Sequence, residues 1–230
     1  MEPTIKFIKN GLPSKGWIEM TMIIDLLPSL LEGLKTTLLL FGIILVITIP
    51  LGFLVALIRV YAPKGISVIV QLYIYIMRGT PLLLQLMVVF FGLPQIGITL
   101  DRFPAAIIAF VLNYTAYYAE IFRGGIMAVP KGQYEALKVL GIGKIRGYRR
   151  IIIPQVSRMV LPSVGNEVIS LVKDTSLVYI LGLGELLRAG QIASNTYASL
   201  IPFVAVGVIY LLITGLVTVF LTNIEKKIHF

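Results

Sequence analysis

Long apolar stretches constrain this chain more than any other feature of its sequence. A helix needs about 20 apolar residues to cross roughly 30 Å of hydrocarbon. Hydrophobic residues form 57% of the sequence and the mean hydropathy is +0.93, which excludes an ordinary soluble domain. We therefore predict an all-α membrane protein with five transmembrane helices, over residues 30–58, 66–93, 104–122, 161–181 and 201–221.

The second apolar stretch is too long for one straight helix. It is interrupted by Arg78, Gly79, Thr80 and Pro81. Proline removes a backbone donor and glycine loosens a helix, so we expect the helix to break here. Backbone groups of Gly79 and Thr80 that such a break releases could bind a transported solute.

Other parts of the sequence limit what else the chain contains. The absence of cysteine and a single histidine, His229, exclude structural disulfides and Cys/His metal centres. Residues 1–28 lack an apolar run with a cleavage site, so we expect an amino-terminal lead-in that could form an interfacial helix. Residues 29–230 then form one transmembrane domain. Five helices rarely enclose a gated pathway alone, which favours an oligomer.

A polar segment, residues 123–158, separates the third and fourth predicted spans. It holds eight basic residues and one acidic residue, Glu135. Its sequence predicts a short helix from about Lys131 to Leu140, ended by Gly141 and Gly143 because glycine is a poor helix former and a frequent C-cap. Such a helix would be presented to a partner outside the membrane.

The distribution of basic residues predicts the orientation. Five spans place the termini on opposite sides, and basic residues favour cytoplasmic segments. An outer amino terminus puts twelve basic residues inside and five outside, the five being Lys6, Lys9, Lys15, Arg102 and Arg188. We expect the amino terminus outside and the carboxyl terminus and polar segment in the cytoplasm.

The chain carries no recognisable motif for its own energy supply. Gly143 and Lys144 are followed by Ile145, so the phosphate-binding pattern GxxxxGK[ST] fails, and HExxH is absent. Work done by this protein would draw on a partner or an ion gradient.

Four motifs together resemble one family of transporters. The run from Gly132 to Gln155 resembles the EAA loop of ABC importer permeases, in particular those for polar amino acids. The segments 78–81, 119–125 and 173–177 agree with it in order and topology. Leu137 stands where the family often has a second alanine.

The resemblance implies a type I ABC importer permease fold in a bacterial or archaeal cytoplasmic membrane. The polar segment would be a coupling loop docked on a cytoplasmic ATPase subunit, present in two copies, which binds ATP and Mg; this chain would hold no cofactor. An identical or homologous second permease and an extracellular or periplasmic amino acid binding protein would complete the complex. The implied coupling residues are Gln133, Glu135, Ala136, Gly141, Arg149 and Pro154. The alternative is a basic loop that fixes topology and attracts anionic lipid.

The fourth predicted span contains polar residues that are costly in hydrocarbon and so face a cavity or a partner. Glu167, Ser170 and Asp174 share one helical face, and Asn166, Ser170 and Lys173 a neighbouring one. Glu167 and Asp174 are our stronger candidates for a substrate amine. The alternative is a structural ion pair, Lys173 with Asp174 or between helices.

The third predicted span carries a second polar face, Asn113, Tyr117 and Glu120. Glu120 could receive a cation on its way to the cytoplasm, or it could pair with Arg123. Tyr114 and Tyr118 are expected to pack against neighbouring helices.

Arg78 has two interpretations. Its guanidinium could clamp a substrate carboxylate, or it could extend to the membrane interface. Acids in the spans favour a basic amino acid such as arginine, lysine or histidine. Glutamine or another polar amino acid is the alternative, and an ion-coupled transporter or channel independent of ATP is the rival class.

Overall fold

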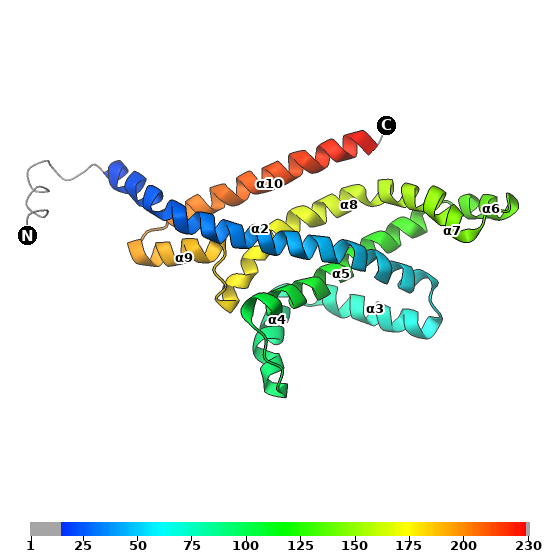
Figure 1. Ribbon diagram of the computed structural model, residues 1–230, viewed down its shortest axis with the longest axis horizontal. Helices are drawn as coiled ribbons and strands as arrows, with labels where there is room; N and C mark the ends of the chain where they lie inside the picture. Colours follow the sequence, from blue (N-terminus) through cyan, green and yellow to red (C-terminus); the bar gives the residue numbers. More distant parts are fainter. Residues whose placement is uncertain (1–14, 229–230) are drawn as a thin grey trace, which may run out of the picture.

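The chain folds into an elongated bundle of helices (Figure 1). The computed structural model describes the backbone of residues 15–228 and the side chains of residues 24–228. Residues 1–14 of the predicted lead-in, with Lys6 and Lys9, and His229 lie outside the described backbone, whereas residues 15–28 form the start of α2. No strand occurs in the described part. The elements in order are α2 (Lys15–Tyr61), α3 (Lys64–Gly79), α4 (Leu82–Met87), η1 (Val88–Gly92), η2 (Leu93–Ile96), α5 (Arg102–Ala128), α6 (Lys131–Val139), α7 (Lys144–Gly147), η3 (Tyr148–Ile152), α8 (Ile153–Asp174), η4 (Thr175–Leu181), α9 (Leu186–Tyr197) and α10 (Ile201–Ile228).

Helix α2 forms the long axis of the bundle and packs on α5. Polar residues inside it are satisfied within the helix, because the Oγ1 atoms of Thr37 and Thr48 donate to the carbonyl oxygens of Gly33 and Ile44, at 3.1 and 2.7 Å. At Gly52 a side chain would collide with Tyr118 of α5. The glycine therefore allows the two helices to approach closely.

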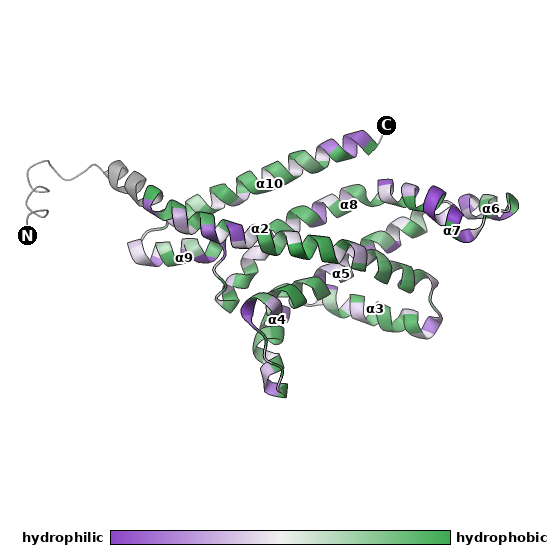
Figure 2. Ribbon diagram, in the orientation of Figure 1, coloured by the Kyte–Doolittle hydropathy of each residue, from purple (hydrophilic) through white to green (hydrophobic). Residues whose placement is uncertain are grey.

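The main core lies where α2, α5 and α8 meet. Leu40 and Ile44 of α2, Phe110 and Tyr114 of α5 and Leu171 of α8 are all buried there. Outside the core, apolar residues dominate the outward faces of the helices, most visibly along α10, whereas α6 and α7 are largely hydrophilic (Figure 2). This distribution is that of a protein whose solvent is lipid.

Three described helices are long and apolar enough to cross a membrane: Ile24–Tyr61, Arg102–Ala128 and Ile201–Ile228. The pair from Lys64 to Gly79 and Leu82 to Ile96 would make a fourth, bent span. These match four of the five predicted spans. Helix α8 covers the remaining one, but it is more polar and turns into a 3₁₀-helix at Thr175, so five crossings remain a prediction.

The predicted break in the second stretch is confirmed. Helix α3 ends at Gly79, and Thr80 is extended, with φ −120° and ψ 147°, as expected for a residue before proline. Helix α4 starts after Pro81 and turns by 104° from α3, so it leaves the long axis of the molecule (Figure 1).

The predicted short helix in the polar segment is α6, which ends one residue early, at Val139. The backbone N–H of Ile142 donates to Leu137 and that of Gly141 to Lys138, at 3.0 and 3.2 Å, while Gly141 has φ +63°. This is a Schellman closure, which needs a left-handed residue at the position of Gly141. With α7, this helix lies at one extreme of the bundle (Figure 1).

Candidate functional site

The break between α3 and α4 is closed by two side-chain amides. Gln85 Nε2 lies within hydrogen-bonding distance of the carbonyl oxygens of Met77 and Thr80, at 2.9 and 3.2 Å, and of Thr80 Oγ1, at 2.7 Å. Asn113 Nδ2, from α5, donates to Met77 O at 2.9 Å and to Gln85 Oε1 at 3.1 Å. Backbone groups released by the break are thus satisfied within the protein. Sequence reasoning missed Gln85, whose signal was an amide in an apolar run directly after proline.

Arg78 lies at the same break, beside Tyr117 of α5. Its guanidinium carbon is 5.2 Å from the centre of the Tyr117 ring, which is within range for a cation–π interaction. The Arg78 side chain is exposed and donates no hydrogen bond to a described residue. The guanidinium is therefore held in place while its donors stay available.

Asp174 is bound to a tyrosine rather than to the neighbouring lysine. The hydroxyl of Tyr114, itself buried, donates to Asp174 Oδ2 at 2.7 Å, whereas Lys173 is exposed. The alternative Lys173–Asp174 ion pair is not formed among the described residues, because consecutive helical residues do not face each other. Tyr114 thus binds Asp174 as well as packing in the core.

Glu120 pairs with Arg123, the alternative that the spacing left open. Arg123 Nη2 lies 2.6 Å from Glu120 Oε1, and Arg123 Nε lies 2.9 Å from Glu120 Oε2. This two-pronged contact is the geometry that a guanidinium and a carboxylate favour. Each side chain remains 30% exposed, so the ion pair is partly accessible at the surface of α5.

Seven of the predicted pathway residues fall into three groups. Arg78, Gly79, Thr80, Asn113 and Tyr117 gather at the break, Asp174 meets Tyr114, and Glu120 meets Arg123. Glu167 and Ser170 are half-buried on α8, and Asn166 is exposed.

Helix α6 is anchored on one side and exposed on the other. Leu137 is buried against α7, where any side chain at Gly147 would lie 2.8 Å from Leu137 Cδ1. Tyr134 OH donates to Ile126 O at 3.1 Å. The six predicted coupling residues, Gln133, Glu135, Ala136, Gly141, Arg149 and Pro154, are all exposed. The element is thus a fixed helix with an open outer surface.

Comparison with known proteins decides the family. A sequence model of the family described as binding-protein-dependent transport system inner membrane component matches residues 48–230.

The chain belongs to this family. The arginine transport system permease protein ArtQ of Bacillus subtilis (strain 168) is 36% identical over 213 residues, 92% of this chain and 97% of ArtQ. The putative glutamine transport system permease protein GlnP of Rickettsia conorii is 36% identical over 200 residues, 86% of this chain and 92% of GlnP. A chain in the crystal structure of an amino acid ABC transporter with histidines is 34% identical, with a TM-score of 0.83 over 89% of this chain and 96% of that chain.

These relatives confirm the resemblance carried by the four motifs. The protein is a multi-pass inner membrane permease of the amino acid ABC transporter class, and its fold is that of an ABC transporter permease. It is a transport subunit and not an enzyme, since ATP hydrolysis in this family belongs to a separate subunit.

Three tyrosines of the permease connect α6 and η3 to α2. Tyr148 OH donates to Tyr61 OH at 3.0 Å, and their rings meet edge to face with centres 5.6 Å apart. The ring of Tyr134 lies 6.0 Å from that of Tyr148. This tyrosine cluster (Tyr61, Tyr134 and Tyr148) joins the last residue of α2 to α6 and η3.

At the other end of the permease, a buried carboxylate organises α9. The carboxylate of Glu185 caps α9 by accepting from the backbone N–H groups of Leu187 and Arg188, at 2.7 and 2.6 Å, and from Tyr210 OH of α10, at 3.1 Å. Burial raises the pKa of Glu185, against the opposing effect of the two N–H donors. Sequence reasoning missed Glu185, because glutamate is not among the residues that N-cap positions prefer.

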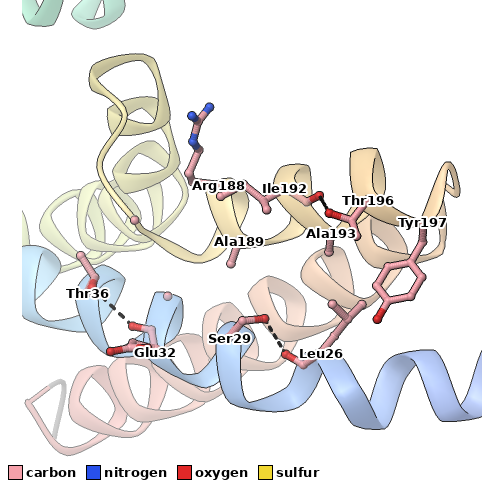
Figure 3. Close-up of a pocket in the computed structure, with 12 residues that line it drawn as sticks. Leu26, Ser29, Glu32, Thr36, Arg188, Ala189, Ile192, Ala193, Thr196 and Tyr197 are labelled. Carbon is pink, nitrogen blue, oxygen red and sulfur yellow. Dashed lines mark hydrogen bonds between the residues drawn. The ribbon is translucent and has the colours of Figure 1, made fainter.

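A cavity of about 560 Å³ lies between α2 and α9. Figure 3 shows Glu32 on α2 and Arg188, Ile192 and Tyr197 on α9 around it, with the Arg188 side chain directed away from α2. At Gly33 the helices come so close that a Cβ would lie 2.9 Å from the carbonyl oxygen of Glu185. The cavity thus follows the line where α9 packs on α2.

Proposed function

We propose that this permease subunit mediates ATP-driven import of polar amino acids with cationic side chains, such as arginine, lysine or histidine. The observation that carries the proposal is the half-buried Glu167 on α8, in a chain 36% identical to an arginine permease. A half-buried carboxylate on a membrane-spanning helix is energetically costly unless it contacts a cation or a polar partner. Import of glutamine or another polar amino acid is the alternative, with GlnP of Rickettsia conorii as the equally identical relative.

The pathway in this proposal runs along α5 and α8. Arg78 would bind the substrate carboxylate, since its donors are available beside Tyr117, and Glu167 would bind the cationic side chain. Asp174 Oδ1 would accept a second hydrogen bond from the substrate, because Tyr114 occupies Oδ2. Gly79, Thr80, Asn113, Glu120, Asn166, Ser170 and Lys173 would complete the path.

The proposed topology has five crossings, with α8 as the fourth, the amino terminus outside and the carboxyl terminus in the cytoplasm. It places α6 and α7 in the cytoplasm, in accord with their basic side chains. The outer loops, 94–103 and 182–199, would then receive the amino acid binding protein.

In the assembled importer, the exposed surface of α6 would dock on the ATPase subunit, which holds ATP and Mg. Two such subunits and a second permease, identical or homologous, would complete the transporter. Closure of the ATPase subunits would move the two coupling helices together and open the pathway outward. Such coupling requires that each ligand favour a different conformation.

The test is the complex reconstituted in vesicles with its ATPase subunit and binding protein. Arginine, lysine and histidine should stimulate ATP hydrolysis and accumulate inside, whereas glutamine should do neither. Glu167→Gln should reduce uptake of arginine about tenfold or more through loss of a charge-assisted hydrogen bond. Ser163→Ala, at an exposed side chain of α8 outside the proposed path, is the matched control because it keeps the helix and its charge. Undiminished arginine uptake by Glu167→Gln, or stimulation by glutamine alone, would overturn the cationic substrate.

A further inference from the structure

A second cavity, of about 770 Å³, lies between the end of α2 and the coupling element, by which we mean α6 and α7 (residues 131–147). One wall is formed by Leu57 and Ile58 of α2 and by Ala62 directly after it, and the other by Leu137 and Ile142 around α6. The tyrosine cluster, Tyr61, Tyr134 and Tyr148, lines the space between the two walls. A cavity of this size and apolar lining can hold a chain-like apolar group.

The charged residues that line this cavity are both basic. They are Lys138 on α6 and Lys144 on α7. Both side chains are exposed, and the ion pair that forms among the described residues, Glu120 with Arg123, involves neither lysine. The cavity therefore combines apolar walls with two cations and no acid.

The cavity lies where a membrane-spanning helix ends. The apolar span Ile24–Tyr61 finishes at a residue of its wall, and tyrosines are enriched at the boundary between hydrocarbon and headgroups. The apolar wall of α2 is thus continuous with the lipid-facing side of that span, while both lysines lie on the elements beyond it.

We propose that this cavity, between the end of α2 and the α6–α7 element, binds an anionic phospholipid. The acyl chain packs against Leu57, Ile58 and Leu137, and the phosphate group lies beside Lys138 and Lys144. Basic residues near a membrane surface attract anionic lipid, each by about 1 kcal/mol, and the apolar walls add the burial of methylene groups. A bound lipid would link the coupling element directly to the membrane.

Photolabelling of the purified full-length permease tests this site. The permease is placed in vesicles of phosphatidylcholine that contain a trace of phosphatidylglycerol with a photoreactive group in its acyl chain. We expect labelled peptides from residues 57–62 and 137–148. Phosphatidylcholine carrying the same photoreactive chain should label these peptides far less.

Two variants test separately how the lysines and the apolar walls contribute to lipid binding. Lys138→Gln with Lys144→Gln should weaken labelling of these peptides by about 25-fold, from about fivefold for each lysine. Ala62→Trp, which fills the cavity and keeps both lysines, should also weaken it. The matched control is Lys226→Gln with Lys227→Gln, which removes two basic residues at the end of α10 and should leave the labelling unchanged. Labelling of peptides from α10 reports that each variant remains inserted and folded.

Three outcomes would overturn the lipid site. They are equal labelling by the two lipids, unchanged labelling in the double lysine variant, and complete displacement of the label when the ATPase subunit binds, which would make the cavity a protein docking surface. The inference rests on the membrane placement of α2 and not on the transported amino acid. Since labelling needs neither ATP nor amino acid, its failure leaves the proposed function untouched, and failed transport leaves the lipid site untouched.

Discussion

The α6–α7 element and the α5–α8 interface both carry polar residues, but they use them in opposite ways. On α6 and α7 the polar side chains are exposed, and the element is held by buried Leu137. Between α5 and α8 the polar side chains hold the helices, as in the bond from Tyr114 to Asp174. The difference teaches where a substitution should affect folding and where it should affect docking alone.

The largest loss of stability should follow truncation of Leu137, the apolar anchor of α6. Leu137→Ala leaves a void against Gly147 and should cost about 2–5 kcal/mol locally. Hydrogen exchange of the amides in 131–139 should accelerate accordingly. Val139→Ala is the matched control, because Val139 is 86% exposed on the same helix. Equal exchange in the two variants would show that α6 is not anchored through Leu137.

A smaller loss should follow removal of one hydroxyl from the α5–α8 interface. Tyr114→Phe leaves Asp174 Oδ2 without its donor and should destabilise the permease by about 1–3 kcal/mol. Thermal unfolding of the purified permease in detergent measures this. Tyr75→Phe, at a side chain 74% exposed, should not shift the transition. An unshifted transition for Tyr114→Phe would mean that the hydrogen bond contributes nothing to the interface.

Loss of the Tyr148 hydroxyl should be milder still. Tyr148→Phe keeps the ring contacts and removes the hydrogen bond to Tyr61, a net contribution of about 1 kcal/mol. This bond joins η3 to α2, and the ring of Tyr148 contacts that of Tyr134 on α6. Its loss should loosen the attachment of α6, so the complex should hydrolyse more ATP per amino acid imported. Tyr75→Phe, at the exposed tyrosine of α3, is the control. A normal ratio of ATP to amino acid would rule out a role in coupling.

The smallest effect on folding should come from the exposed surface of α6. Glu135→Gln should change stability by less than about 0.5 kcal/mol. It should nevertheless weaken copurification of the ATPase subunit and lower amino acid-stimulated ATP hydrolysis. Lys131→Gln, at the first residue of the same helix, is the control for charge loss alone. If Glu135→Gln unfolded the permease, the contrast between the two regions would fail.

The sequence predicted features that depend on neighbouring residues. The break before Pro81 and the end of α6 at Gly141 follow from the local chemistry of proline and glycine. Four motifs likewise led to the family, which the comparisons with known proteins then showed.

Contacts between distant segments escaped prediction. Tyr114 and Asp174 are 60 residues apart, and nothing in either segment indicates which of several polar partners each would choose. The number of crossings stays a prediction for another reason. The polar residues of α8 lower the mean hydropathy of that helix, so it is not among the helices apolar enough to cross a membrane. The anchoring of Leu137 depends on the bare backbone of Gly147, which periodicity alone does not reveal.

The closed break between α3 and α4 has a mechanical consequence. The carbonyl oxygen of Met77, on α3, accepts hydrogen bonds from the side-chain amides of Gln85 on α4 and Asn113 on α5. The three helices are therefore linked through one oxygen atom. Replacing Pro81 alone would therefore not straighten the chain. A rotation of α5 would instead displace α4 through these hydrogen bonds. Because α4 lies at 104° to α3, that displacement would be directed across the axis of α3.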